Sequence, residues 1–206
     1  KKKKNCDNFV ILDEEMGTEK ENYARIAKRR IWPNSEEYID KYFVIGNYAY
    51  NVSSNIFPRM KNSIKCTGWP RVDLWRKEHE LLFAKQTELI SKKYGKFILF
   101  VSDFGYNSQK FIDGRLNRVK NSKWKSLVNE LSLEKERAKR TFREYNNFLK
   151  LFKEYDKIKE CPLIIIRPHP AEDIDAWLNF SKELTNIKVI YEGEITPWIN
   201  ASSVLL

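Results

Sequence analysis

Short runs of apolar residues, separated by helical segments, constrain the fold of this chain more than any other feature. The runs at residues 97–101 and 163–166 contain only Ile, Leu, Phe and Val. Continuous apolar runs of this length are typical of strands that are covered on both faces, as in a parallel sheet. They are far too short to cross a bilayer. We therefore expect an α/β fold.

The second half of the chain extends these runs into an alternation of strands and helices. We expect strands at residues 97–101, 163–166, 188–191 and 203–206, and helices at residues 78–93, 122–159, 174–184 and 196–201. This order is typical of a doubly wound parallel sheet. We therefore expect residues 68–206 to form an incomplete C-terminal Rossmann-like domain.

The N-terminal region predicts a smaller portion of the same kind of fold. Strands are expected at residues 9–12, 42–45 and 63–67, and helices at residues 22–30, at residues 48–56 and from Ser35 onward. Gly68 and Pro70 then interrupt regular structure. We place a domain boundary there and expect residues 1–67 to be part of a second Rossmann-like domain.

The chain is strongly basic and has few residues suited to metal binding. Its 206 residues carry a formal net charge of +10, which predicts an anionic partner such as nucleic acid, an anionic lipid surface or a phosphate-bearing substrate. The three cysteines form no Cys-x-x-Cys pair and only two histidines occur, so we expect neither a metal nor a cofactor. Scattered cysteines and the lack of an apparent secretory signal predict a cytoplasmic location, with peripheral contact as the only contact with a membrane.

The motif Arg-Pro-His-Pro at residues 167–170 is the strongest candidate for a binding site. It follows an expected strand, and ligands of open α/β sheets bind beyond the carboxyl ends of the strands. Arg167 offers a planar fork of donors for phosphate, and His169 adds a further donor. Pro170 and the proline before the histidine stiffen the loop. The alternative is a rigid structural turn that carries a surface histidine.

Four motifs in the same order resemble those of a known family. They are Asp-Glu-Glu at residues 13–15, Thr-Gly-Trp-Pro-Arg-Val-Asp-Leu at residues 67–74, Arg-Pro-His-Pro at residues 167–170 and Pro-Trp at residues 197–198. Together they resemble the bacterial surface carbohydrate (polysaccharide) biosynthesis proteins, over most of the chain. In the second motif this chain has Trp69 and Val72 where that family usually has Asn and Phe.

The resemblance implies a glycosyltransferase with the GT-B fold, in which two Rossmann-like domains face a cleft. The His-Pro pair is similar to the one that bacterial sialyltransferases, polysialyltransferases and capsule Kdo transferases use on CMP-sugars. His169 is therefore expected to contact the donor phosphate. The Ser/Thr motif that those families place further on is not found here, so the donor nucleotide stays open. By the same resemblance, residues 1–67 lie on the acceptor side and residues 68–206 bind the nucleotide sugar.

Asp13, Glu14 and Glu15 are the candidates for the catalytic base. They follow an expected strand, and inverting sugar transfer needs a base that accepts the proton of the acceptor hydroxyl. Polysialyltransferases resemble this arrangement with an acidic pair before glycine, although a methionine separates Glu15 from the glycine here. Glu15 is slightly favoured over Glu14. The alternative is an acidic loop that caps the helix at residues 22–30.

Two more strand ends carry candidate donor-binding residues. Ser102 follows the strand at residues 97–101 in a loop with glycine, where backbone amides can approach a phosphate. Glu192 follows the strand at residues 188–191, the place where GT-B enzymes often hold the base and ribose of the nucleotide. The alternative in both places is a plain connecting loop.

The leading hypothesis is a metal-independent glycosyltransferase of capsule or lipopolysaccharide biosynthesis. Its partners are a nucleotide-sugar donor, CMP-linked as one candidate, a glycan or lipid-linked acceptor, and an anionic membrane surface, with no nucleic acid. A second hypothesis is a polyol-phosphate transferase of the teichoic-acid type. A third is a basic nucleic-acid-binding or scaffold protein. The basic helix at residues 122–159 fits the third, but its aromatic residues fall on the apolar stripe of the helix.

Overall fold

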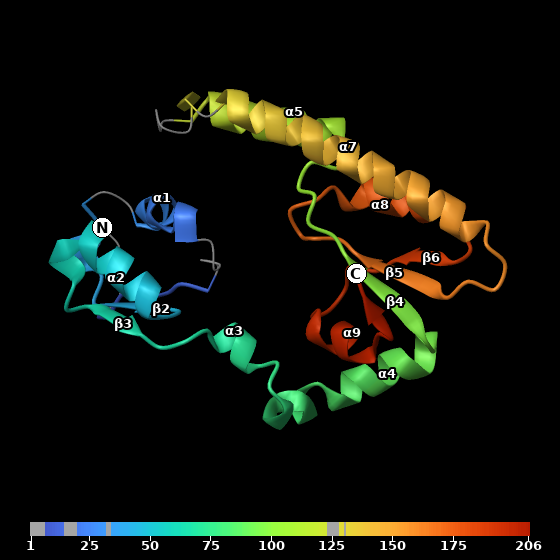
Figure 1. The fold of residues 1–206 in the computed structure, drawn as a ribbon, viewed down its shortest axis with the longest axis horizontal. Helices are drawn as coiled ribbons and strands as arrows, with labels where there is room; N and C mark the ends of the chain where they lie inside the picture. The colour runs from blue at the N-terminus through green and yellow to red at the C-terminus, as the bar shows by residue number, and fades with distance from the viewer. Residues whose placement is uncertain (1–6, 15–19, 32–33, 123–127, 130) are drawn as a thin grey trace. The chain divides into compact units, whose positions relative to one another are not determined.

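The computed structural model describes residues 7–14, 20–31, 34–122, 128–129 and 131–206 (Figure 1). The chain divides into two compact units, Lys1–Leu81 and Leu82–Leu206. The division therefore lies later in the chain than the boundary expected at Gly68. Residues after Gly68 are tied to the first unit because Trp69 Nε1 donates to the backbone oxygen of Glu14 at 3.0 Å.

The first unit is built on a three-stranded parallel sheet in the order β1-β2-β3. Its strands and main helices are β1 (Val10–Leu12), α1 (Lys20–Arg30), β2 (Lys41–Val44), α2 (Asn47–Ile56) and β3 (Ile64–Cys66). Tyr42, Val44 and Ile64 of the strands pack with Ala27 of α1 and Ala49 of α2 in one core. These elements confirm the three expected strands and the helices expected at residues 22–30 and 48–56.

Short helical turns connect these elements. They are η2 (Glu36–Tyr38), η3 (Pro58–Met60) and α3 (Pro70–Asp73). The helix that we expected from Ser35 is only the single turn η2, and the Ser35 side chain makes no capping hydrogen bond. The turn stops because Ile39 adopts an extended backbone conformation, just before β2 begins.

The second unit contains a four-stranded parallel sheet in the order β6-β5-β4-β7. The strands are β4 (Phe97–Val101), β5 (Leu163–Arg167), β6 (Ile187–Val189) and β7 (Val204–Leu205). The chain moves outward from β4 through β5 to β6 and then returns to the other side of β4. This reversal of strand order is the one found in doubly wound α/β sheets. The expected α/β class with parallel sheets is thereby confirmed.

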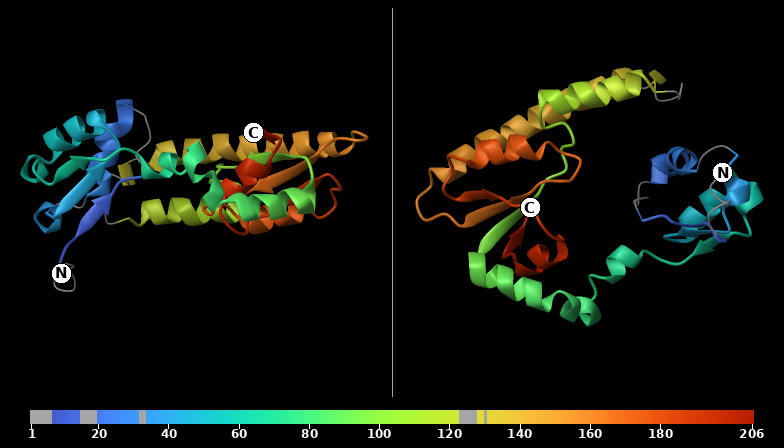
Figure 2. Two further views of the ribbon diagram at one scale, coloured as in Figure 1. Left: turned by 90° about the horizontal axis from the view of Figure 1, so that it is seen from below. Right: turned by 180° about the vertical axis from the view of Figure 1, so that it is seen from behind.

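Helices cover both faces of this sheet (Figures 1 and 2). On one face, Phe100 and Ile166 pack with residues of α7 (Leu131–Asp156) and α8 (Ile174–Ser181). On the other face, Leu99 and Ile165 pack with α4 (Ala84–Tyr94) and α9 (Thr196–Ala201). Successive residues of a strand point to opposite faces, so both faces need apolar residues. This accounts for the uninterrupted apolar runs in the sequence.

Three helical segments differ from the expectation. The expected helix at residues 78–93 is divided into η4 (Lys77–Leu82) and α4. The helix expected over residues 122–159 is α7, and residues 123–127 and 130 lie outside the described part. Helix α5 (Gln109–Lys120) was not expected at all, and its N-terminus is capped by Ser108, whose Oγ accepts a hydrogen bond from Phe111 N. Within the described residues, no helix is both long and apolar enough to cross a membrane.

Candidate functional site

The candidate site lies where β4 and β5 end side by side. Val101 pairs with Arg167 in the parallel register, and Ser102 N donates to the Arg167 carbonyl oxygen at 3.1 Å. The chain then leaves β4 through residues 102–108 and leaves β5 through residues 168–173. Both loops therefore start from the carboxyl edge of the sheet, where α/β proteins bind their ligands.

A buried carboxylate joins the two loops. Glu172 is only 2% exposed and accepts hydrogen bonds from Ser102 Oγ at 2.8 Å, Phe104 N at 2.7 Å and Trp177 Nε1 at 2.5 Å. An ionised carboxylate is an acceptor only, so three donors converging on it match its bonding capacity well. Glu172 thus anchors the β4–α5 loop to the start of α8.

Ser102 is consequently placed away from solvent. It is 2% exposed, and its hydroxyl donates to Glu172. We expected Ser102 to face the donor phosphate, but in this geometry the side chain supports the loop instead. A buried hydroxyl with a charged partner is costly to redirect, because the buried carboxylate would then lose a donor.

A second connection fixes the same pair of loops. Asn107 Nδ2 donates to the Asp173 carbonyl oxygen at 2.8 Å, and Asp173 N donates to Asn107 Oδ1 at 2.7 Å. Ser108, the N-cap of α5, donates its hydroxyl proton to Asp173 Oδ2 at 2.6 Å. Asp173 is itself the N-cap of α8 and accepts from Ala176 N. The N-termini of α5 and α8 are therefore held together by their own capping residues.

Arg167 is a structural residue in this arrangement. It is 6% exposed, and its Nη1 and Nη2 atoms donate to the carbonyl oxygens of Glu192 at 2.5 Å and Gly193 at 2.7 Å. Its Cζ lies 5.1 Å from the centroid of the Trp198 ring. Burial lowers the pKa of the guanidinium from its ordinary value. The carbonyl groups of the β6–α9 loop thus take the N–H donors that we expected to bind a phosphate.

His169 is exposed, with one ring nitrogen already engaged. Ala171 N donates to His169 Nδ1 at 3.0 Å, and Glu172 N donates to the His169 carbonyl oxygen at 2.9 Å. Because Nδ1 accepts, the proton of the neutral ring is assigned to Nε2. Nε2–H is then the donor that an anion can use. Pro170, also exposed, follows within the same turn.

Glu192 lies in the loop that Arg167 holds. Glu192 is exposed, and only its backbone oxygen takes part in the contact with Arg167. Gly193, which follows it, has a φ of +74°, a conformation that favours glycine. The carboxylate of Glu192 is thus presented to solvent on a loop whose backbone is fixed, so its predicted contact with ribose hydroxyls remains a prediction.

The acidic candidates belong to the first unit. Asp13 is 6% exposed, and its Oδ2 accepts from Tyr42 Oη at 2.8 Å. Burial, followed by the charge and hydrogen bond of Asp13, raises the pKa of Tyr42 above its ordinary value, so this phenol stays a donor. Glu14 is partly exposed, and Glu15 lies outside the described residues. Asp13 therefore orders the end of β1, and the role of a base stays a prediction for Glu14 and Glu15.

Beside the His169 loop, the structure contains an open cavity of about 670 Å³ that the sequence did not predict. Its lining residues come from the loops after β4 and β5, from α5 and from the residues just after α5. They are Gly105, Phe111, Arg115, Arg118, Val119, Ser122 and Ala171. Arg115 and Arg118 are the basic residues of this lining. They were missed because α5 itself was not expected, although their spacing of three places both on one face of a helix.

Within the described part of the chain, no group of three His, Cys, Asp or Glu side chains is arranged to hold a metal ion. Comparisons of the chain with family models, with curated proteins and with solved structures gave no match in any of the three.

Proposed function

We propose that this protein is a glycosyltransferase of bacterial surface polysaccharide biosynthesis that uses a nucleotide-activated sugar. The observation that carries the proposal is the position of His169. It stands exposed at the carboxyl edge of a parallel sheet, on a loop with two prolines, with Nδ1 bonded to Ala171 N and Nε2–H available. An exposed donor held in this way suits the phosphate of a nucleotide sugar.

In the proposed reaction, His169 binds the donor phosphate and stabilises the charge that develops on the leaving nucleotide. Glu192 accepts hydrogen bonds from the ribose. Glu14 or Glu15 accepts the proton of the acceptor hydroxyl as the new glycosidic bond forms. Basic side chains take the part that a metal plays in other transferases. The GT-B arrangement of the two units and a cytoplasmic, membrane-peripheral location belong to the same proposal.

A polyol-phosphate transferase is the second candidate, because its donor also presents a phosphate to a basic loop. The two candidates differ in the ligand that the site prefers. A nucleic-acid-binding role is less well supported, since Tyr145, Phe148 and Phe152 of α7 pack toward the sheet rather than presenting a stacking surface.

A thermal-shift panel of CMP, UDP, GDP and CDP-glycerol tests the proposal. A ligand that binds only the folded state raises the melting temperature. We expect one of the first three nucleotides to stabilise the parent and to stabilise His169→Ala much less. His79→Ala is the matched control, because His79 is the other histidine of the chain and lies in η4. Stabilisation by CDP-glycerol alone favours the polyol-phosphate transferase, and an unchanged melting temperature throughout argues against both.

A further inference from the structure

The cavity beside the His169 loop is basic, and two arginines lie in its lining. Arg115 and Arg118 lie on α5 and line the cavity together with Gly105 and Ala171. Among the described residues, no carboxylate forms an ion pair with either arginine. On the same helix, Asp113 accepts from Gln109 Nε2 instead. Two guanidinium groups thus line an open cavity, and none of the carboxylates that the structure describes neutralises them.

Arg115 is held in place by an aromatic ring. Its Cζ lies 4.8 Å from the centroid of Tyr106, a residue that is 2% exposed. A guanidinium over a ring face is attracted by the ring and keeps its N–H groups free at the edges. Arg115 is therefore positioned by a contact that uses none of its hydrogen-bond donors.

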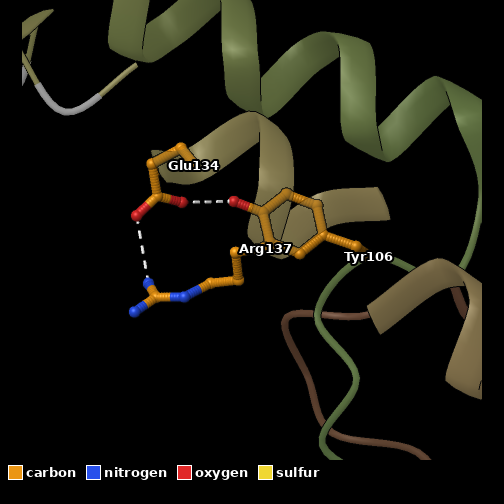
Figure 3. A network of polar contacts seen from close by, with 3 residues as sticks. All are labelled: Tyr106, Glu134 and Arg137. Carbon is orange, nitrogen blue, oxygen red and sulfur yellow. Dashed lines mark hydrogen bonds and ion pairs between the residues drawn. The ribbon is translucent and has the colours of Figure 1, made fainter. Parts of the chain in front are cut away.

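Tyr106 is held in turn by a hydrogen bond to Glu134, which itself forms an ion pair with Arg137 (Figure 3). Its hydroxyl donates to Glu134 Oε2 at 2.6 Å, while Arg137 Nη1 binds Glu134 Oε1 at 3.0 Å. Burial, and next the bond to Glu134, raise the pKa of Tyr106 to about 12. The phenol stays protonated, so the ring that supports Arg115 does not change its charge near neutral pH. The carboxylate nearest to this ring is already used by Arg137.

The backbone of Gly105 forms another part of the cavity lining, beside the guanidinium of Arg115. Gly105 has a φ of +68°, and a Cβ at this position would lie 3.4 Å from Arg115 Nη1. The positive φ favours glycine here, while the space would accept a Cβ in ordinary contact with Arg115. On the far side, Ala171 belongs to the turn in which its own N–H donates to His169 Nδ1. The cavity therefore opens next to the histidine to which we assign the donor phosphate.

We propose that Arg115 and Arg118 form the main phosphate-binding site of this protein. They thereby take the role that the sequence analysis expected of Arg167. The site binds a phosphate ester, and the volume of about 670 Å³ leaves room for the group that the phosphate carries. Two planar guanidinium forks match the oxygens of a phosphate or diphosphate. The assignment of this ester to a nucleotide sugar rests on the proposed function. The basic site itself rests on the cavity and on its two arginines, which pair with no carboxylate in the described part of the chain.

Calorimetric titration with pyrophosphate, CMP, UDP and a soluble short-chain lipid phosphate tests the site. We compare the parent chain with Arg115→Gln, Arg118→Gln and Arg115→Lys, and use Lys120→Gln as the control. Lys120 is an exposed cation of the same helix that does not line the cavity. Each Arg→Gln change is expected to weaken the best ligand by about ten- to a hundredfold. Arg115→Lys is also expected to lose most of the affinity for this ligand. The lysine keeps the positive charge but lacks the planar guanidinium donors.

The outcomes separate this inference from the proposed function. If Arg115→Gln and Arg118→Gln bind as tightly as Lys120→Gln while His169→Ala binds weakly, the arginine site is wrong and the proposed function stands. If the arginines matter for pyrophosphate or lipid phosphate but no nucleotide binds, the site stands and the donor assignment is wrong. If the folded parent binds none of these phosphates, the site is overturned. Ligand-free melting temperatures confirm that each variant is folded.

Discussion

The guanidinium of Arg167 lies over the ring of Trp198, with 5.1 Å between Cζ and the ring centroid. The same guanidinium donates to two backbone carbonyl oxygens of the β6–α9 loop. One side chain at the end of β5 thus holds both the loop after β6 and the helix that leads to β7. The relation makes Arg167 a part of the scaffold, whereas its neighbour His169 is exposed.

Replacing Arg167 should therefore lower the stability of the folded protein. Hydrogen bonds to charged groups contribute about 1.5–3 kcal/mol each, so Arg167→Ala is expected to lower the free energy of unfolding by about 3 kcal/mol. Urea unfolding followed by circular dichroism measures the change. Arg118→Ala, an exposed arginine, is the control and should stay within about 0.5 kcal/mol of the parent. Equal stability of the two variants would contradict the structural role of Arg167.

Glu172 should be the most sensitive position of the two loops. In Glu172→Gln, an amide NH₂ would replace one carboxylate oxygen and would face either Phe104 N or the pair Ser102 Oγ and Trp177 Nε1. Breaking a buried charged network in this way is expected to cost about 2–4 kcal/mol. The exposed Glu183 provides the control Glu183→Gln. Thermal unfolding monitored by tryptophan fluorescence checks both, and a melting temperature of Glu172→Gln equal to that of the control would show that the network is dispensable.

The raised pKa of Tyr106 predicts a loss of stability at alkaline pH. The pKa of the phenol is raised from 10.0 in the unfolded chain to about 12 in the folded chain. Between these pH values the unfolded state therefore binds fewer protons. The stability contribution is complete below pH 10 and is lost as pH rises toward 12. Tyr106→Phe should start less stable and fall less steeply over this range. Denaturant unfolding at several pH values measures the slopes, and parallel slopes for the parent and Tyr106→Phe would contradict the assignment.

The net charge of +10 predicts attraction to anionic lipid, where lipid-linked acceptors are found. A basic residue near such a surface contributes roughly 1 kcal/mol, and salt screens the attraction. We expect flotation with anionic vesicles at low salt and its loss at high salt. Equal flotation with neutral vesicles would show that charge is not the cause.

The strands of both units could be predicted because their signal is local. A buried parallel strand must be apolar on both faces, and Phe97–Val101 shows this within its own residues. Helix α5 was missed because only four of its twelve residues, Phe111, Ile112, Leu116 and Val119, are apolar, and because Gly114 lies near its middle. The signal that was available is Ser108, which suits an N-cap.

The role of Arg167 could not be predicted from the motif that contains it. Its acceptors, the carbonyl oxygens of Glu192 and Gly193, lie 25 and 26 residues further along the chain. The motif shows that a donor stands at a strand end, but the fold decides whether that donor meets a ligand or another loop. For His169 the contact is local, because the partner of its Nδ1 is the N–H of Ala171 in the same turn.

Binding of the preferred nucleotide to His169→Ala, measured by isothermal titration calorimetry, tests the central claim most directly. The lost hydrogen bond to a charged phosphate should weaken binding by about one to two decades, at about 1.4 kcal/mol per decade. The melting temperature without ligand should stay unchanged, because the exposed side chain packs little. His79→Ala should bind as the parent does. If His169→Ala also binds as tightly as the parent, the Arg-Pro-His-Pro loop is a structural turn and the proposed site is wrong.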